Sequence, residues 1–393
     1  MDAIALPAYL FNSGQLDGFY PIKQYTVWTD VDMNLLVFNL KTDADDSVLG
    51  FTTDWINALA KKCDRVVVIT MFMGRLAVDQ NVQVFSIGKE KSYSEPRRLI
   101  EFYRLLIKVL RTEKIDACFA HMIQLFAILG WPLLKIKKIP ILLWYEHSHV
   151  PISLRIATAL VDRIVAASPN GFRIKTHKFR SIGHGVDIQR FTPATTSSIS
   201  TCQKVRLLTL GRLSPVKCLE TAIEAIALLP DKLKHRIELR YIGDPIDAKG
   251  KAYASQLKET VSKLALENVV TFQPALPFFK VQAAYHSADI FINSSNTDSI
   301  DKTVLEAMSC GLAVITSNSA FVNVFEEALA KQWCIPKNRP DILARRVEQL
   351  VAMSPQERQE LGSRLRERVK ASHSLEALSR RLVTEVIPSI DAC

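Results

Sequence analysis

The sequence has few cysteines for its length, and their arrangement narrows what the protein can be. Its 393 residues contain seven cysteines, an odd number, with no C-x-x-C pair and no cluster of cysteine and histidine at zinc spacing. Neither a disulfide framework nor a structural zinc site is therefore indicated. We expect the cysteines to be reduced thiols in a cytoplasmic protein.

The sequence also lacks a segment of about twenty uninterrupted apolar residues, the length that a membrane-spanning helix needs. Its beginning lacks the basic and then apolar stretches of a signal peptide. We therefore predict a cytoplasmic protein without a transmembrane helix. Hydrophobic residues still make up 48% of the chain, enough for the cores of two or three domains.

Lys and Arg outnumber Asp and Glu by 50 to 40, which gives a net charge of +10. This excess favours an acidic partner, such as nucleic acid, anionic lipid or a phosphorylated substrate. Because the basic residues are dispersed and no aromatic-basic module accompanies them, we predict no nucleic-acid partner.

The clearest local pattern lies at residues 289–316. Apolar runs of strand length flank a segment with helical spacing, and Gly311 stands where that helix would end. The pattern predicts a parallel βαβ unit. Ligands of such sheets lie outside the carboxyl ends of the strands, so the loop at 296–301 would face a bound molecule. The N-terminus of the following helix would suit a phosphate.

Two carboxylates, Asp298 and Glu306, stand eight residues apart in this unit. Beside a phosphate site, carboxylates hold hydroxyl groups rather than the phosphate itself. The pattern therefore predicts a nucleotide-sugar pocket. The alternative is that Asp298 is an ordinary loop residue and Glu306 a solvated helix residue.

The residues DSIDKTVLEAMSCGLAVITS, at 298–317, resemble the signature of glycosyltransferase family 4. These are retaining enzymes of GT-B fold, with two Rossmann-like α/β domains whose parallel sheets face each other across a cleft. The resemblance implies that Glu306 binds the ribose and Asp298 the sugar hydroxyls, where the family has a glutamate in place of Asp298. It implies donor contacts from the helix start as well, at Ser299, Ile300 and Thr303.

A second motif begins the expected donor domain. After the predicted strand Val205 to Leu210 come Gly211 and Arg212, then a helix predicted to start at Pro215 with Lys217 in its first turn. A cation is unfavourable there unless an anion binds. The family pattern G-R-x-x-x-x-K-G implies that Gly211, Arg212 and Lys217 bind the donor diphosphate, with Cys218 in the place of the usual glycine. Two surface cations are the alternative.

In the first half of the chain, a predicted strand from Ile139 to Tyr145 ends in Glu146, His147, Ser148 and His149. The resemblance implies a catalytic histidine close to the transferred sugar, with His147 as the better match and His149 as the second. A structural histidine is the alternative for either.

The first loop of the family is glycine-rich and borders acceptor and phosphate, but here it retains only Gly50. The acidic run before it contains Asp43-Ala44-Asp45, which has the D-x-D form of metal sites in the other glycosyltransferase fold. We favour a solvated loop or an acceptor contact, and we predict no metal and no cofactor, because the cations would hold the phosphates.

The predicted domains are residues 33–195 on the acceptor side and 200–377 on the donor side, joined by a linker rich in Thr and Ser. A C-terminal helix at about 378–393 is expected to pack back on the first domain. Residues 1–32 have no clear period and form either an extension of unclear role or an N-terminal strand and cap. At 99–143 the sequence predicts helices with cations along the border of an apolar face. Such helices either contact an anionic membrane or simply cover the sheet.

The sequence thus predicts a metal-independent retaining hexosyltransferase. It would use a nucleotide diphosphate-sugar and a glycan or lipid-linked acceptor. The expected location is the cytoplasm, with peripheral attachment to the inner face of a membrane as a further option. Two alternatives stay open, which are a degenerate GT-B protein that binds nucleotide or membrane without turnover and a GT-B nucleotide-sugar epimerase.

Overall fold

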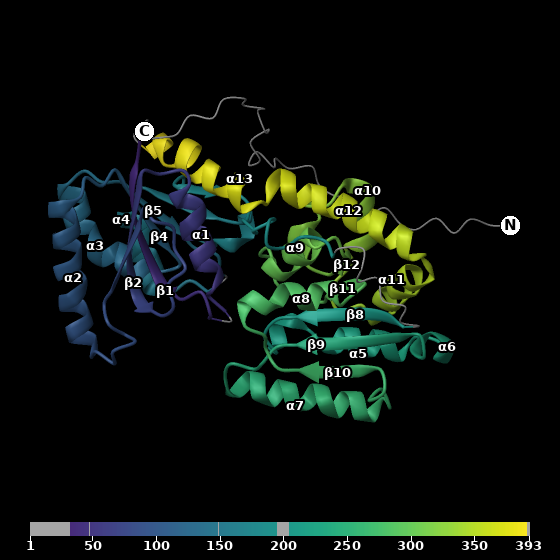
Figure 1. Ribbon diagram of the computed structural model, residues 1–393. Helices are drawn as coiled ribbons and strands as arrows, with labels where there is room; N and C mark the ends of the chain where they lie inside the picture. The colour runs from purple at the N-terminus through teal and green to yellow at the C-terminus, as the bar shows by residue number, and fades with distance from the viewer. Residues whose placement is uncertain (1–31, 47, 148, 195–203, 391–393) are drawn as a thin grey trace.

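The computed structural model describes residues 32–46, 48–147, 149–194 and 204–390. Two parallel β-sheets, one in each half of the chain, are covered by helices on both faces (Figure 1). Of the predicted extension at 1–32 only Asp32 is described, and of the predicted linker at 194–203 only Ala194.

The first sheet has seven strands in the order β3-β2-β1-β4-β5-β6-β7. Its strands are β1 (Asn34–Thr42), β2 (Arg65–Met73), β3 (Val82–Ser86), β4 (Ala117–His121), β5 (Ile141–Trp144), β6 (Arg163–Ala166) and β7 (Phe179–Ser181). The helices of this half are α1 (Phe51–Ala60), α2 (Glu95–Thr112), α3 (Gln124–Ile136), α4 (Ile152–Leu160) and the short η1 (Pro169–Gly171).

The second sheet has five strands in the order β10-β9-β8-β11-β12. These are β8 (Val205–Leu210), β9 (Ile237–Ile242), β10 (Val270–Gln273), β11 (Ile290–Asn293) and β12 (Ala313–Thr316). The helical segments of this half are η3 (Pro215–Lys217), α5 (Glu220–Ala227), α6 (Asp231–Lys234), α7 (Ala248–Lys263), η4 (Phe278–Lys280), α8 (Val281–His286), α9 (Lys302–Ser309), η5 (Ser319–Phe321), α10 (Glu327–Trp333), α11 (Pro340–Ala352) and α12 (Pro355–Ser372).

Strands such as β1, β2, β5 and β11 contain apolar runs without alternation because helices cover both faces of each sheet. In β1, for example, Leu35 to Phe38 are all buried, so side chains that point to opposite faces both lie in a core. This explains why the sequence shows apolar runs rather than alternation, and why strand positions could be predicted within a few residues.

In each sheet the strand order reverses at one strand, so that later strands in the sequence are added on its other side. In the first sheet β1 pairs with both β2 and β4, and in the second β8 pairs with both β9 and β11. The loops that follow these paired strands diverge to opposite faces and leave a crevice at the carboxyl edge. The two crevices are therefore the places where the fold can hold a ligand.

The C-terminal helices connect the two halves. Helix α12 runs along the second half and α13 (Leu375–Arg380) continues toward the first, as the yellow ribbon in Figure 1 shows. The chain goes on as a π-helical segment, η6 (Arg381–Val386), and a last turn, η7 (Pro388–Ile390). Val186 pairs with Ser374, and the Arg163 guanidinium donates to the Ser389 carbonyl at 3.2 Å. Contacts from the C-terminal segment thus reach the first sheet.

Within the described ranges, no helix is both long and apolar enough to cross a membrane. The five cysteines that the structure describes are all free thiols.

Candidate functional site

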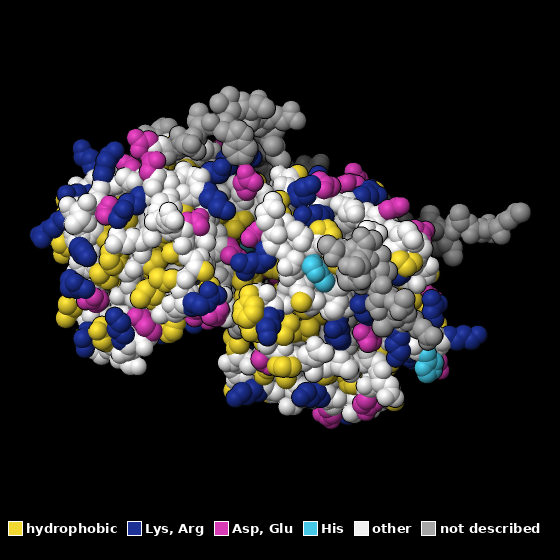
Figure 2. Space-filling view, in the orientation of Figure 1, with side chains coloured by type: hydrophobic (Ala, Val, Ile, Leu, Met, Phe, Trp, Pro, Cys, Tyr) yellow, Lys and Arg dark blue, Asp and Glu magenta, His cyan; other side chains and the backbone are white. Residues whose placement is uncertain are grey.

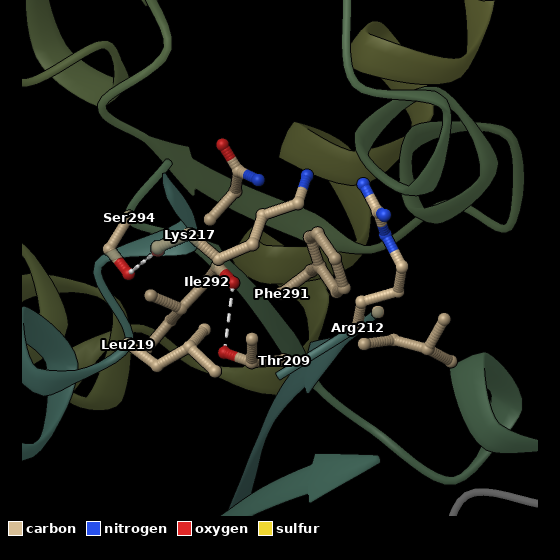
Figure 3. Close-up of a pocket in the computed structure, with 10 residues that line it drawn as sticks. Thr209, Arg212, Lys217, Leu219, Phe291, Ile292 and Ser294 are labelled. Atoms are coloured by element: carbon tan, nitrogen blue, oxygen red, sulfur yellow. Dashed lines mark hydrogen bonds between the residues drawn. The ribbon is translucent and has the colours of Figure 1, made fainter. Parts of the chain in front are cut away.

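A pocket opens at the carboxyl edge of the second sheet, where β8 and β11 lie side by side. Gly211 and Arg212 follow β8, and Lys217 comes from the next turn (Figure 3). Arg212 and Lys217 extend in the same direction on either side of Phe291. Gly211 has φ +137°, so the chain turns sharply at the strand end. The structure therefore brings together the three residues that the sequence assigned to a diphosphate.

The helix predicted to start at Pro215 is wrong in its first turn. Pro215–Lys217 form a separate 3₁₀ turn, and α5 begins only at Glu220. Between them Cys218 has φ 44° and ψ 48°, the left-handed conformation that glycine adopts at least cost. A glycine, as in the family pattern, would adopt this conformation without strain. Lys217 consequently lies outside the helix, and the helix-dipole argument does not apply to it.

The partner of Lys217 is Asp301, a residue that the sequence analysis missed. Its carboxylate pairs with the Lys217 ammonium and accepts hydrogen bonds from Asn293 Nδ2 at 3.0 Å and Asn318 Nδ2 at 3.3 Å. Burial alone would raise the pKa of Asp301, but Lys217 and the hydrogen bonds from Asn293 and Ser295 together lower it. In sequence Asp301 resembles an ordinary N-cap of α9, yet its side chain makes no cap hydrogen bond.

Asp298 lies at the edge of the same site and is also paired. The Lys337 ammonium and the Ser319 hydroxyl both donate to Asp298 Oδ1 at 2.6 Å. These two hydrogen bonds lower the pKa of Asp298, and the charge of Arg173 from the first half of the chain adds to the effect. The side chain is 40% exposed, so it is accessible to a ligand. Sequence spacing gave no signal for Lys337 or Arg173, which are distant in the chain.

Glu306 is more deeply placed than Asp298. Its side chain is 4% exposed, with the Tyr285 hydroxyl donating to one carboxylate oxygen at 2.8 Å and the Lys302 ammonium 3.3 Å from the other. A carboxylate has about four acceptor positions, so two remain for further hydroxyl groups. The alternative interpretation, in which Glu306 is a solvated helix residue, is therefore wrong.

Three further predicted contacts lie next to the start of α9. The Ser299 carbonyl accepts from Asn318 Nδ2 at 2.7 Å, and the Thr303 carbonyl accepts from the Tyr285 hydroxyl at 3.2 Å. The Ile300 side chain is buried, and its amide donates to Glu146 of the first half. Ser299 and Ile300 precede the helix, which begins at Lys302, so both lie in the connecting loop.

His147 follows β5 and is exposed, with Nδ1 accepting from the His149 amide at 2.9 Å. Partial burial lowers its pKa, and the charges of His149 and Arg212 lower it further. Arg212 belongs to the second half of the chain, so His147 lies across from the pocket. His149 is exposed as well, and its amide serves to orient the His147 ring.

Glu146 is a partly buried acid beside His147 that the sequence analysis did not single out. It accepts hydrogen bonds from the Ala167 amide at 2.5 Å and the Ser168 hydroxyl at 3.2 Å. Burial raises the pKa of Glu146 to about 7, although these donors oppose the shift. A Cβ on Gly171 would lie 2.3 Å from its carboxylate, so the glycine makes room for it.

The first loop completes the junction between the halves. Gly50 precedes α1, and a Cβ on it would lie 3.1 Å from Phe278 Cβ of the second half. In the acidic run, Asp45 binds the Arg75 guanidinium through two hydrogen bonds of 2.7 Å. Among the residues that the structure describes, no three His, Cys, Asp or Glu side chains are grouped to hold a metal.

Comparison with solved structures identifies the architecture. The chain superposes on the Anabaena HepE protein, solved in complex with UDP and glucose, with a TM-score of 0.71, 16% identity and coverage of 92% of this chain and 100% of that one. A sucrose-phosphate synthase from Thermosynechococcus elongatus superposes with a TM-score of 0.70 and 16% identity, over 92% of this chain and 100% of that one. The chain has the GT-B fold. Its two sheets are the two Rossmann-like domains, and at this identity the likeness shows the fold alone.

Sequence comparison concerns mainly the second domain. Residues 200–368 match the family described as Glycosyl transferases group 1. The putative colanic acid biosynthesis glycosyltransferase WcaL of Escherichia coli K12 is 26% identical over 207 residues, 51% of this chain and 48% of that protein. The mannosylfructose-phosphate synthase of Agrobacterium fabrum is 27% identical over 173 residues, 40% and 37% of the two chains. The chain thus spans at most about half the length of these relatives.

Proposed function

We propose that the protein is a retaining hexosyltransferase that uses a nucleotide diphosphate-sugar. The observation that carries the proposal is the joint placement of Arg212 and Lys217 in one pocket at the crevice of the second sheet. That pocket lies within the segment that matches glycosyl transferases of group 1. The HepE structures were solved with UDP, UDP and glucose, or UDP-glucose, which supports a nucleotide-sugar donor for the same fold.

In this proposal the two cations stabilise the leaving group. As the bond between sugar and diphosphate breaks, negative charge grows on the phosphate oxygens that Arg212 and Lys217 contact, and no metal is needed. Asp301 holds the Lys217 ammonium in the pocket. The departing phosphate accepts the proton of the acceptor hydroxyl on the same face of the sugar, so configuration is retained without a protein nucleophile.

The remaining residues position the donor and exclude water. Glu306 holds the ribose, and Asp298 and His147 hold the sugar from the two sides of the cleft. The loop at Ser299 and Ile300, with Thr303, borders the diphosphate, and Gly50 lets the first loop approach. Contact between the domains keeps water from the activated sugar and limits hydrolysis.

The acceptor is proposed to be a glycan or a lipid-linked sugar, with the protein in the cytoplasm and at an anionic membrane surface. On α2, exposed Leu99, Ile100 and Ile107 alternate with arginines and lysines, and the space-filling view shows hydrophobic and basic side chains side by side on this domain (Figure 2). Such a helix can bind anionic lipid through both kinds of side chain.

The first test is a thermal-shift screen with UDP-, GDP-, ADP- and dTDP-sugars. A ligand that binds only the folded protein stabilises it by about 2.7 kcal/mol at one hundred times its Kd, so one donor class should raise Tm. With that donor, Lys217→Ala should lower kcat by about 10²- to 10³-fold. Lys331→Ala, at an exposed position of α10, is the control and should leave kcat unchanged.

The same experiments separate the alternatives. Donor binding without turnover against any acceptor would indicate a protein that binds but does not catalyse. Release of free nucleotide without an acceptor would indicate an epimerase. Loss of activity in EDTA that Mg²⁺ or Mn²⁺ restores would contradict the metal-independent mechanism.

A further inference from the structure

Four charged side chains, of which Glu306 is buried and the other three are partly buried, lie together where the two domains meet. Asp54 of α1 binds Arg190 at 2.9 Å, and Lys302 lies 3.3 Å from Glu306 on α9. Burial raises the pKa of Asp54 to about 6, while Arg190 and Lys302 oppose this shift. The group contains two cations and two anions, so its charges balance without solvent. Only Glu306 among these four residues was predicted to belong to the site.

The Lys302 ammonium contacts both domains. It lies 3.9 Å from the centre of the Phe51 ring, at the start of α1 in the first domain, and 4.6 Å from the Phe278 ring in the second. The Arg190 guanidinium lies 4.9 Å from the same Phe278 ring. An ammonium over aromatic faces is attracted more strongly when it is removed from water, and the Lys302 side chain is only 19% exposed.

Lys302 also fixes the direction of the Glu306 carboxylate. Tyr285 holds one carboxylate oxygen from inside the second domain, and Lys302 holds the other. The position of Lys302 depends in turn on Phe51 and on the negative charge of Asp54, both in the first domain. Separation of the domains would remove the contacts with Phe51 and Asp54, so that only Glu306 and Phe278 of its own domain would hold Lys302.

We propose that Lys302 is a positioning residue that orients Glu306 toward the donor ribose only when the two domains are in contact. The inference rests on the proposed function, because it takes Glu306 as the group that binds the ribose hydroxyls. It adds a physical link between closure of the cleft and recognition of the nucleotide. Donor affinity then depends on a ring and a carboxylate of the domain that does not bind the nucleotide.

The test measures how much the ribose hydroxyls contribute to binding. Calorimetry compares UDP, GDP and ADP with their 2′,3′-dideoxy analogues, and the ratio of the two Kd values is the ribose factor. In the wild-type protein we expect a factor of about ten or more for the nucleotide of the donor, because the hydroxyls donate to a carboxylate. In Lys302→Met, which keeps the apolar stem, this factor should fall to nearly one.

Two variants make the result specific. Lys331→Met removes an exposed lysine that also pairs with a glutamate one turn away, and it should keep the wild-type factor. Phe51→Leu changes only the first domain, and it should reduce the factor if the link is real. If Lys302→Met does not fold, the ribose factor of Phe51→Leu still tests the proposal. Small-angle scattering of the ligand-free proteins should show a larger radius of gyration for Lys302→Met and Phe51→Leu.

A loss of affinity that is equal for the parent and dideoxy nucleotides would mean a merely structural role and would overturn the proposal. An unchanged ribose factor in a folded Lys302→Met protein would do so as well. If the wild-type protein binds no nucleotide or nucleotide sugar, the proposed function fails. The radius of gyration then still decides whether Lys302 holds the domains together.

Discussion

At the scale of single residues, Cys218 has a backbone conformation that its residue type does not predict. The residue sits between two helical segments in a left-handed conformation, with φ 44°. A side chain there costs about 1–2 kcal/mol relative to the right-handed region. The thiol is buried next to the Pro215 carbonyl, 3.4 Å away, so its packing offsets part of that cost.

A comparison of two variants isolates the backbone effect. Cys218→Gly and Cys218→Ala both remove the thiol, but only the alanine retains a Cβ in the unfavourable region. We expect the glycine variant to have a free energy of unfolding about 1 kcal/mol higher than the alanine variant, measured by urea denaturation.

The control for this pair is Lys258, an exposed residue inside α7. There the backbone is right-handed, so glycine should be about 1 kcal/mol less stable than alanine. The same sign at both positions would contradict the account of Cys218.

At the scale of elements, α2 is amphipathic in a way that leaves apolar side chains in solvent. Phe102, Leu105, Leu106 and Val109 are buried against the first sheet, as in any helix that covers a sheet. Ile100 on the other side is 69% exposed, and Lys108 and Arg111 are exposed further along the helix. Burial against the sheet accounts for one face of the helix and leaves the other available to a membrane.

The membrane proposal therefore predicts that Ile100→Asp weakens binding to vesicles that contain an anionic lipid. The substitution removes apolar surface that the membrane would bury, and it adds a negative charge that anionic lipid repels. A vesicle flotation assay at low salt measures the effect. Leu228→Asp is the matched control, since Leu228 is 59% exposed but lies in the second domain. Equal binding by both variants, or no binding by the wild type, would rule out this surface.

At the scale of the whole molecule, the two domains meet through hydrogen bonds and charges as well as apolar contacts. Glu146 of the first domain accepts a hydrogen bond from the Ile300 amide of the second. The Arg366 guanidinium on α12 donates to the carbonyls of Phe191 at 2.8 Å and Ile188 at 3.2 Å, where the first domain ends. Such directional contacts make the relative placement of the domains specific.

The raised pKa of Glu146, about 7, predicts a dependence of stability on pH. Between about pH 4.5 and 7 the folded protein binds a proton at Glu146 that the unfolded chain does not, so this group's contribution to the free energy of unfolding falls as pH rises. The fall amounts to about 3 kcal/mol at most. Urea denaturation from pH 4 to 8 should show it as a difference between the wild type and Glu146→Gln.

The difference in the free energy of unfolding between the wild type and Glu146→Gln should change between about pH 4.5 and 7 and level off at higher pH. Parallel curves would show that Glu146 ionises in the folded protein as it does in water.

The sequence by itself determined the elements and the order in which they alternate. Strands such as β1 and β8 are marked by runs of apolar residues, because burial on both faces leaves no place for polar ones. The short pattern from Gly211 to Lys217 and the acids at Asp298 and Glu306 could be recognised for a similar reason, since each is local in the chain. The resemblance of these motifs to glycosyltransferase family 4 predicted the GT-B fold correctly.

Only the tertiary structure decided which charges face one another. Asp301 with Lys217, Lys337 with Asp298, and Asp54 with Arg190 are pairs separated by 39 to 136 positions in the chain, and no local pattern encodes them. Burial decides the strength of such pairs, because it removes the water that would screen them. The left-handed turn at Cys218 and the cation of Lys302 between two rings likewise follow from packing between segments that the sequence does not place side by side.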